Sequence, residues 1–220
     1  MKYMPYRNLN LSNDEYYHIY NRGNSKQIIF RDNKDYEYFQ KLLKILNTDK
    51  NIALRNTKSI NDITSDNNEN LVSIGVYCLM PNHFHILIKQ EKDGGISLFI
   101  KKVLTAYVMY FNKKYERTGS LFEGRFKSKH INDDNYLKYL FSYIHLNPIK
   151  IKDKIWNKNS DYKKQSNLDF LKSYKYSSLL DYVGFKRDEN FIINEDAFPK
   201  YFKTKEETLN FIKKWIDIKI

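Results

Sequence analysis

The chain has 220 residues, of which 41% are hydrophobic and 29% charged, a balance that argues against global disorder. Its formal net charge of +12 favours a polyanionic partner, either nucleic acid or an anionic membrane surface. A lysine-rich surface that serves only solubility would give the same excess. The single cysteine, Cys78, excludes an internal disulfide and a CxxC metal site. No apolar stretch has the length of a membrane span or a signal peptide, so we expect a soluble, cytoplasmic protein.

The first elements of the chain are expected to be a strand and a helix. Residues 16–22 are aromatic and β-branched and stop at Gly23, a pattern that predicts a strand. A helix should follow from about Asp32, because apolar residues recur at helical spacing between positions 36 and 46. Asp32 or Asn33 can cap the free N–H groups at its start.

Two apolar runs in the middle of the chain predict a pair of antiparallel strands. They cover residues 71–80 and 83–90, and the Pro81-Asn82 dipeptide between them makes a tight turn. Residues 47–70, which precede these strands, are mostly polar. We interpret that segment as a surface insertion or a long hairpin.

The next elements are a long helix, a strand and a second helix. The long helix should run from about residue 97 to residue 115 after Gly94-Gly95, with Thr118-Gly119 ending it. A strand over residues 126–131 should follow. Asn132-Asp133-Asp134 is expected to be the N-cap region of a helix that reaches Leu146. The second helix should stop at Asn147, because a residue before proline disfavours the α region. On the long helix, one face should carry Phe99, Val103, Ala106 and Tyr110.

The resulting order, β-α-β-β-α-β-α, predicts an α+β fold of the ferredoxin-like, split βαβ type. Its antiparallel sheet would carry helices, and the last helix would be an addition to that pattern. We expect one domain over residues 1–183, with 47–70 as its polar insertion, and an appendage of unknown role over residues 184–220. Short helical patterns lie near residues 177–183 and 205–218.

Two histidines in the second strand of the pair are candidate metal ligands. His83 and His85 are two residues apart, so their side chains leave the same face of the sheet, while Phe84, Ile86 and Ile88 occupy the other. Two such imidazoles can bind one divalent ion. A hydrogen-bonded surface pair is an equally good interpretation of an isolated HxH motif.

A tyrosine and an asparagine on the last helix are placed to face those histidines. Tyr143 and Asn147 are four apart and border the apolar stripe that should pack on the sheet. Asn147 offers a carbonyl oxygen as a third metal ligand, and Tyr143 offers a hydroxyl as a nucleophile. With 19 tyrosines in the chain, spacing does not rank Tyr143 above Tyr139. The residues expected to be structural or DNA-stacking are Tyr107, Tyr110, Tyr115, Tyr136 and Tyr139.

Basic and aromatic residues interleave at two places, which is the combination that binds single-stranded nucleic acid. One place surrounds residues 111–115 and the other residues 124–127. A solvated helix face gives the same pattern. The candidate DNA-binding residues are Arg22, Lys113, Lys114, Arg125 and Lys127.

Four stretches of the sequence together resemble one family. They are YHIYNRGNSKQIIF (17–30), YCLMPNHFHILI (77–88), LFEGRFKS (121–128) and YLKYLFSYIHLNPIK (136–150). In this order and spacing, over roughly residues 16–183, the chain is similar to the REP-associated tyrosine transposases, which belong to the single-tyrosine branch of the HUH nuclease superfamily. The chain departs from the family's pattern in two places. Segment 47–70 is longer than expected between the first helix and the second strand, and residues 184–220 have no match.

The resemblance implies a site and a reaction. His83, His85 and Asn147 would bind a divalent metal, Mg²⁺ or Mn²⁺, and Tyr143 rather than Tyr139 would be the nucleophile. The substrate would be single-stranded DNA with hairpins at REP-like palindromes and a short flanking guide sequence, cleaved through a 5′-phosphotyrosine intermediate. Relatives act as monomers or as homodimers, so the oligomeric state does not carry over.

Two other functions remain open at this point. One is a non-catalytic nucleic-acid-binding module, and the other is a metal-dependent phosphoesterase that uses water. The group that would activate Tyr143 is also unassigned. His145 and Lys150 are near in sequence, but His145 is rotated by about 200° from Tyr143 on a helix and is a poor candidate.

Overall fold

The structure is a computed structural model that describes residues 11–53, 70–152 and 161–216. At its centre is a four-stranded antiparallel sheet in the order β2-β3-β1-β4. The strands are β1 (Tyr16–Arg22), β2 (Val72–Met80), β3 (His83–Gln90) and β4 (Lys127–Ile131). Along the chain, strands and helices follow one another in the order β1-α1-β2-β3-α2-β4-α3. This order confirms the ferredoxin-like prediction with its additional helix.

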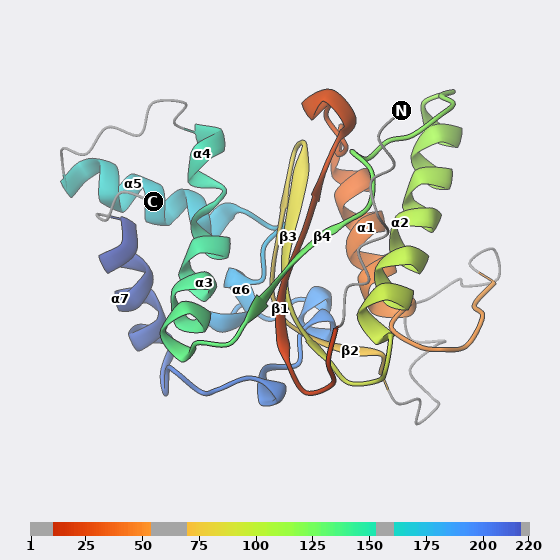
Figure 1. Ribbon diagram of the computed structural model, residues 1–220. Coiled ribbons are helices and arrows are strands. Elements are labelled where there is room, and N and C mark those ends of the chain that lie inside the picture. The colour runs from red at the N-terminus through yellow and green to blue at the C-terminus, as the bar shows by residue number, and fades with distance from the viewer. Residues whose placement is uncertain (1–10, 54–69, 153–160, 217–220) are drawn as a thin grey trace, which may run out of the picture.

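Helices α1 (Asn33–Ile45) and α2 (Gly95–Lys114) cover one face of the sheet (Figure 1). Helix α1 begins where predicted, because the carboxylate of its N-cap residue Asp32 accepts the backbone N–H of Asp35 at 3.1 Å. Helix α2 begins two residues earlier than expected, since Gly94 takes a left-handed conformation, with φ +65°, that starts the first turn.

The buried stripe of α2 differs from the predicted one. Phe99 and Val103 are fully buried as expected, but Ala106 and Tyr110 lie only partly buried at the edge of the core. The stripe continues instead at four-residue spacing, which keeps its side chains on one line facing the sheet. Its remaining members are Tyr107 and Phe111. Tyr107 is therefore a core residue, and its hydroxyl donates to the carbonyl of Ile29.

Helix α3 (Asp134–Leu146) packs on the opposite face and is followed by α4 (Ile149–Lys152), α5 (Asp161–Ser173), α6 (Leu179–Tyr182) and α7 (Lys205–Ile216) (Figure 1). Asp133 caps α3 as predicted, through an oxygen 2.7 Å from the amide of Tyr136. The helix ends at Leu146, but Asn147 keeps helical φ and ψ, contrary to the expectation for a residue before proline. Pro148 directly precedes α4, and the Lys150 N–H bonds to the Asn147 carbonyl at 3.0 Å.

The chain after α4 holds more structure than its polar composition predicted. Helix α5 was not expected, because its buried leucines, Leu168 and Leu171, stand among polar neighbours in the sequence. Three short 3₁₀ turns complete the described elements: η1 (Asn24–Lys26), η4 (Asp188–Ile192) and η5 (Glu195–Ala197).

The C-terminal residues cover the free edge of β2. The amide of Leu79 bonds to the carbonyl of Tyr176 at 2.9 Å, and the amide of Asn194 bonds to the carbonyl of Ile74 at 2.8 Å. Gly75 allows this packing, since a Cβ there would lie 2.8 Å from the ring of Phe198. The region beyond residue 183 thus contributes directly to the core of the folded chain.

Segment 47–70, predicted to be an insertion, lies mostly outside the described residues. Its first residues are held to the core, because the amide of the Asn47 side chain exchanges two hydrogen bonds with the backbone of Val72, at 2.8 and 3.1 Å. None of the helices in the described part of the chain is long and apolar enough to cross a membrane.

Candidate active site

The two histidines of the HxH motif lie on the face of β3 that α3 covers. His85 is 7% exposed and stands opposite Tyr20 of β1 and Cys78 of β2. His83, nearer the β2–β3 turn, is half-buried and stands opposite Arg22. The intervening residues of the strand, Phe84, Ile86 and Ile88, are fully buried against the other helix layer, so the two faces divide as predicted.

Each of the two histidines has a partner for its Nδ1 atom. His83 Nδ1 lies 2.7 Å from the side-chain oxygen of Asn82. Because an amide oxygen only accepts, this Nδ1 carries the proton and the Nε2 lone pair is free. His85 Nδ1 lies 2.9 Å from Nε2 of His18 on β1.

Burial keeps this group of imidazoles neutral. Burial, and then the positive charge of Lys150, lowers the pKa of His83 to about 4. Burial also lowers the pKa of His18 to about 4, with Lys129 adding to the effect, and it lowers the pKa of His85 well below its usual value. Neutral imidazole is the form that binds a metal ion, so no proton has to be displaced at neutral pH.

Tyr143 of α3 approaches these histidines from above the sheet. Its ring meets the ring of His85 edge-on, with centroids 5.7 Å apart, and the ring of His18 at 6.2 Å. The Nζ atom of Lys150 lies 5.0 Å from the centre of the Tyr143 ring. Burial, and then the neighbouring tyrosines, raises the pKa of the Tyr143 phenol, so the hydroxyl is protonated at neutral pH and needs activation.

Asn147 lies one turn after Tyr143 and is 1% exposed. Its Nδ2 donates to the Tyr143 carbonyl at 2.9 Å, and its Oδ1 accepts from Lys150 Nζ at 3.2 Å. Since only the nitrogen can donate to a carbonyl, the orientation of the amide is determined, and its oxygen is on the side of Lys150. The positive charge of Lys150 also contributes to the lowered pKa values of His83 and His85.

The side chains of His83, His85 and Asn147 are of the kinds that could hold a divalent metal. Within residues 11–53, 70–152 and 161–216, no three His, Cys, Asp or Glu side chains converge in a way that could hold an ion. The candidate set is instead two imidazole nitrogens and one amide oxygen, from His83, His85 and Asn147. Such a set leaves coordination positions open for a substrate, as catalytic metal sites require.

Comparison with known proteins identifies the family. The family described as "Transposase IS200 like" matches residues 12–147, more than half of the 220 residues. The chain belongs to the IS200-like transposase family. This protein is therefore a DNA transposase and endonuclease. No curated protein sequence matches it.

A solved structure shares the fold of this transposase. It is described as a REP-associated tyrosine transposase bound to a REP hairpin, and it is 13% identical in sequence. The match covers 92% of this chain and 99% of the other, with a TM-score of 0.51. At that identity the likeness concerns the fold.

Tyr139, the alternative that spacing left open, has different surroundings in this transposase. It lies one helical turn before Tyr143, and its ring contacts Trp215 of α7 with centroids 5.0 Å apart. His145 is fully buried, and its Nε2 lies 2.9 Å from the hydroxyl of Ser178, on the side of α3 away from Tyr143. His145 is thus not placed to take a proton from Tyr143.

Three of the predicted DNA-binding residues lie near the face of the sheet that carries His83 and His85. Arg22, opposite His83, forms a two-pronged ion pair with Glu123. Lys127 stands opposite Tyr20 and is exposed, and Arg125 is exposed in the loop just before β4. They border the face that carries the histidines.

Lys113 and Lys114 lie at the end of α2, in the other helix layer. Lys113 is exposed. Lys114 Nζ, in contrast, is bound to Asp32 at 2.8 Å and to the fully buried carboxylate of Asp35 at 2.7 Å. Its charge is therefore engaged at the start of α1.

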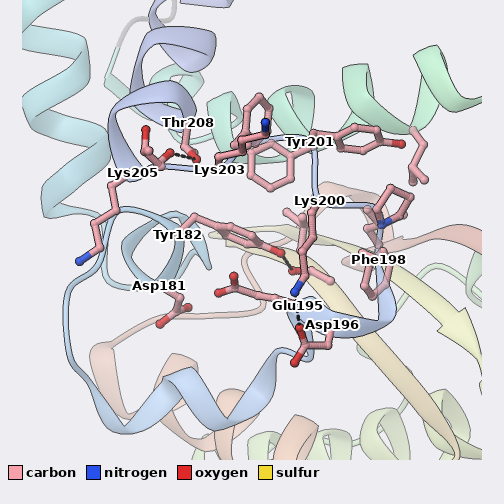
Figure 2. A pocket seen from close by; sticks show the side chains of 18 residues that line it. Asp181, Tyr182, Glu195, Asp196, Phe198, Lys200, Tyr201, Lys203, Lys205 and Thr208 are labelled. Carbon is pink, nitrogen blue, oxygen red and sulfur yellow. Dashed lines mark hydrogen bonds and ion pairs between the residues drawn. The ribbon is translucent and has the colours of Figure 1, made fainter.

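A cavity of about 340 Å³ is separate from this site (Figure 2). Its walls include Phe141 of α3, Tyr182, and the segment that carries Glu195 and Phe198. Phe141 and Tyr143 are two residues apart on a helix, so they point to nearly opposite sides. The cavity and Tyr143 thus lie on different sides of α3.

His18 and Tyr20 are residues of the site that the sequence analysis did not single out. Both fall within the YHIY segment of β1, two apart, on the face shared with His85. Alternation within β1 was visible in the sequence, but their neighbours depend on the β1–β3 register, which brings together residues 67 positions apart.

Proposed function

We propose that this transposase is a metal-dependent nuclease and strand transferase that acts on hairpin-bearing single-stranded DNA through Tyr143. The observation that carries the proposal is the meeting of Tyr143 with His85, at 5.7 Å between ring centroids, within a single chain. The buried amide of Asn147 on the same helix supports it, because its oxygen is presented on the side of Lys150.

His83, His85 and Asn147 would hold the metal, most naturally Mg²⁺ or Mn²⁺. When bound, the ion would supply Lewis acidity to a non-bridging oxygen of the scissile phosphate. Asn82 keeps the Nε2 of His83 unprotonated for this purpose. The positive charge of Lys150, which lies beside both Asn147 and the Tyr143 ring, would stabilise the negative charge that develops on the phosphate.

In the proposed reaction, the Tyr143 oxygen attacks phosphorus in line. A bond forms between this oxygen and phosphorus while the bond from phosphorus to the 3′ oxygen breaks. The phenol loses its proton, and the departing strand gains one as its 3′-hydroxyl. The product is a 5′-phosphotyrosine, and attack by another 3′-hydroxyl reverses the step and joins strands without ATP.

Hairpin-bearing DNA is the proposed substrate for two reasons. The relative with the same fold is described as bound to a REP hairpin. In this chain, Arg22, Arg125 and Lys127 border the catalytic face, where cations can neutralise phosphates. We further propose that residues 1–183 form the catalytic domain and that the appendage of residues 184–220 supports α3 through α7.

The test is an incubation of the protein with a hairpin oligonucleotide and Mn²⁺, followed by a denaturing gel. The natural chain should give a protein–DNA adduct that is absent in Tyr143→Phe and His83→Ala. Tyr139→Phe is the matched control, since it removes the same hydroxyl one turn away and should keep the adduct.

The same gel distinguishes the other functions. Cleavage that persists in Tyr143→Phe without an adduct would establish a water-using phosphoesterase. DNA binding without cleavage, for oligonucleotides that carry the cognate flanking sequence, would establish a non-catalytic binding module. Either result would overturn the proposed reaction.

A further inference from the structure

His18 of β1 is a second buried histidine beside the HxH motif. It is 6% exposed, and its Nε2 lies 2.9 Å from Nδ1 of His85. The two rings are stacked, with centroids 5.0 Å apart and an angle of 28° between their planes. The contact therefore holds His85 in both position and orientation.

The hydrogen bond between the two rings has only two possible forms. A hydrogen bond between two ring nitrogens 2.9 Å apart holds a single N–H, carried either by His85 or by His18. When His85 donates through Nδ1, its Nε2 keeps a lone pair and can bind a cation. When His18 donates instead, His85 carries its proton on Nε2 and cannot act as a ligand there.

We propose that His18 is a positioning residue, whose Nε2 accepts the Nδ1–H of His85 and so keeps the His85 Nε2 available for a divalent cation. The inference rests on the metal site of the proposed function. Asn82 provides a precedent on the same strand, because its amide oxygen sets the proton of His83 in the same way. Each candidate histidine ligand then has its own acceptor, which is the usual arrangement around metal-binding histidines.

Mn²⁺ affinity, measured by the loss of the free-ion electron paramagnetic resonance signal, tests this role without any DNA. His18→Leu removes the acceptor and should weaken Mn²⁺ binding by about 10- to 100-fold. His18→Gln places an amide oxygen near the position of Nε2 and should stay within about threefold of the natural chain. His130→Leu is the matched control: it removes a histidine of the neighbouring strand β4 that is bound to Glu15, and should leave the affinity unchanged.

Nitrogen-15 spectra of the metal-free natural protein test the same point without a variant. The proposal requires the proton of His85 on Nδ1, and a proton found on Nε2 would overturn it. This measurement decides the matter even if His18→Leu does not fold, which circular dichroism would reveal.

The outcomes separate the inference from the function on which it rests. If the natural chain does not bind Mn²⁺, or if His83→Ala binds it equally well, the proposed metal site is wrong, and the inference with it. If His83→Ala loses the ion while folded His18→Leu keeps full affinity, only the role of His18 is refuted. A folded His18→Gln that is as weak as His18→Leu would also refute it.

Discussion

Lys114 and Lys127 should respond in opposite ways to the same substitution, although the sequence suggests DNA binding for both. Lys114→Met is expected to lower the free energy of unfolding while the folded protein keeps its DNA affinity. Lys127→Met is expected to leave stability unchanged and to weaken DNA binding. Methionine keeps the apolar stem of lysine, so each substitution removes mainly the charge.

The magnitude for Lys114 follows from its partner Asp35. This carboxylate is fully buried, and it accepts hydrogen bonds from Lys114 Nζ at 2.7 Å, from the Tyr115 hydroxyl at 2.7 Å and from the Tyr110 hydroxyl at 3.1 Å. Removal of one partner from a buried ion pair costs about 3–5 kcal/mol. The two tyrosines remain, and the Lys114 side chain is 24% exposed, so we expect a smaller cost, about 2–3 kcal/mol.

Urea unfolding measures the first effect, and fluorescence anisotropy with a labelled oligonucleotide at several salt concentrations measures the second. Loss of one phosphate contact should reduce the slope of log K against log salt by about 0.7 for a single strand or 0.9 for a duplex. That reduction is expected for Lys127→Met alone. If Lys114→Met left the free energy of unfolding unchanged and reduced the slope of log K against log salt, Lys114 would be shown to bind phosphate, and its ion pairs to contribute little to stability.

Three further predictions concern packing, pH and the metal site. Gly75→Ala should cost about 1–3 kcal/mol in thermal melts, because the added Cβ would lie 2.8 Å from the Phe198 ring; an unchanged melting temperature would contradict that contact. Burial lowers the pKa of His18 to about 4 and that of His145 to about 3, so below the unfolded value near 6.5 the unfolded chain binds more protons. The free energy of unfolding should then fall by a few kcal/mol as the pH decreases from about 6.5 to 4, and a flat urea-derived profile would be inconsistent with neutral burial. Lys150→Met should raise Mn²⁺ affinity about three- to tenfold, because it removes a positive charge that competes with the cation for the Asn147 oxygen. Weaker Mn²⁺ binding in calorimetry would argue against Asn147 as a ligand.

Local patterns in the sequence were sufficient for the elements that depend on neighbours along the chain. The strands at residues 16–22 and 83–90 were predicted correctly, and the caps Asp32 and Asp133 lie among the residues expected to cap their helices, because alternation and capping involve residues only a few positions apart. Helix α5 was missed for the same reason. Its buried leucines, Leu168 and Leu171, stand among polar residues and give a weak helical periodicity, and they pack in a core formed with distant elements.

The His83 and His85 pair belongs to what the sequence alone determined, since a period of two places both on one face of a strand. Which tyrosine meets them was decided by how α3 packs on the sheet, which directs Tyr143 to His85 and Tyr139 to Trp215. The partner of His85 was decided by the register of β1 against β3, and the role of Lys114 by the approach of α2 to α1. These contacts join residues far apart in the chain, where no local spacing carries information about distance.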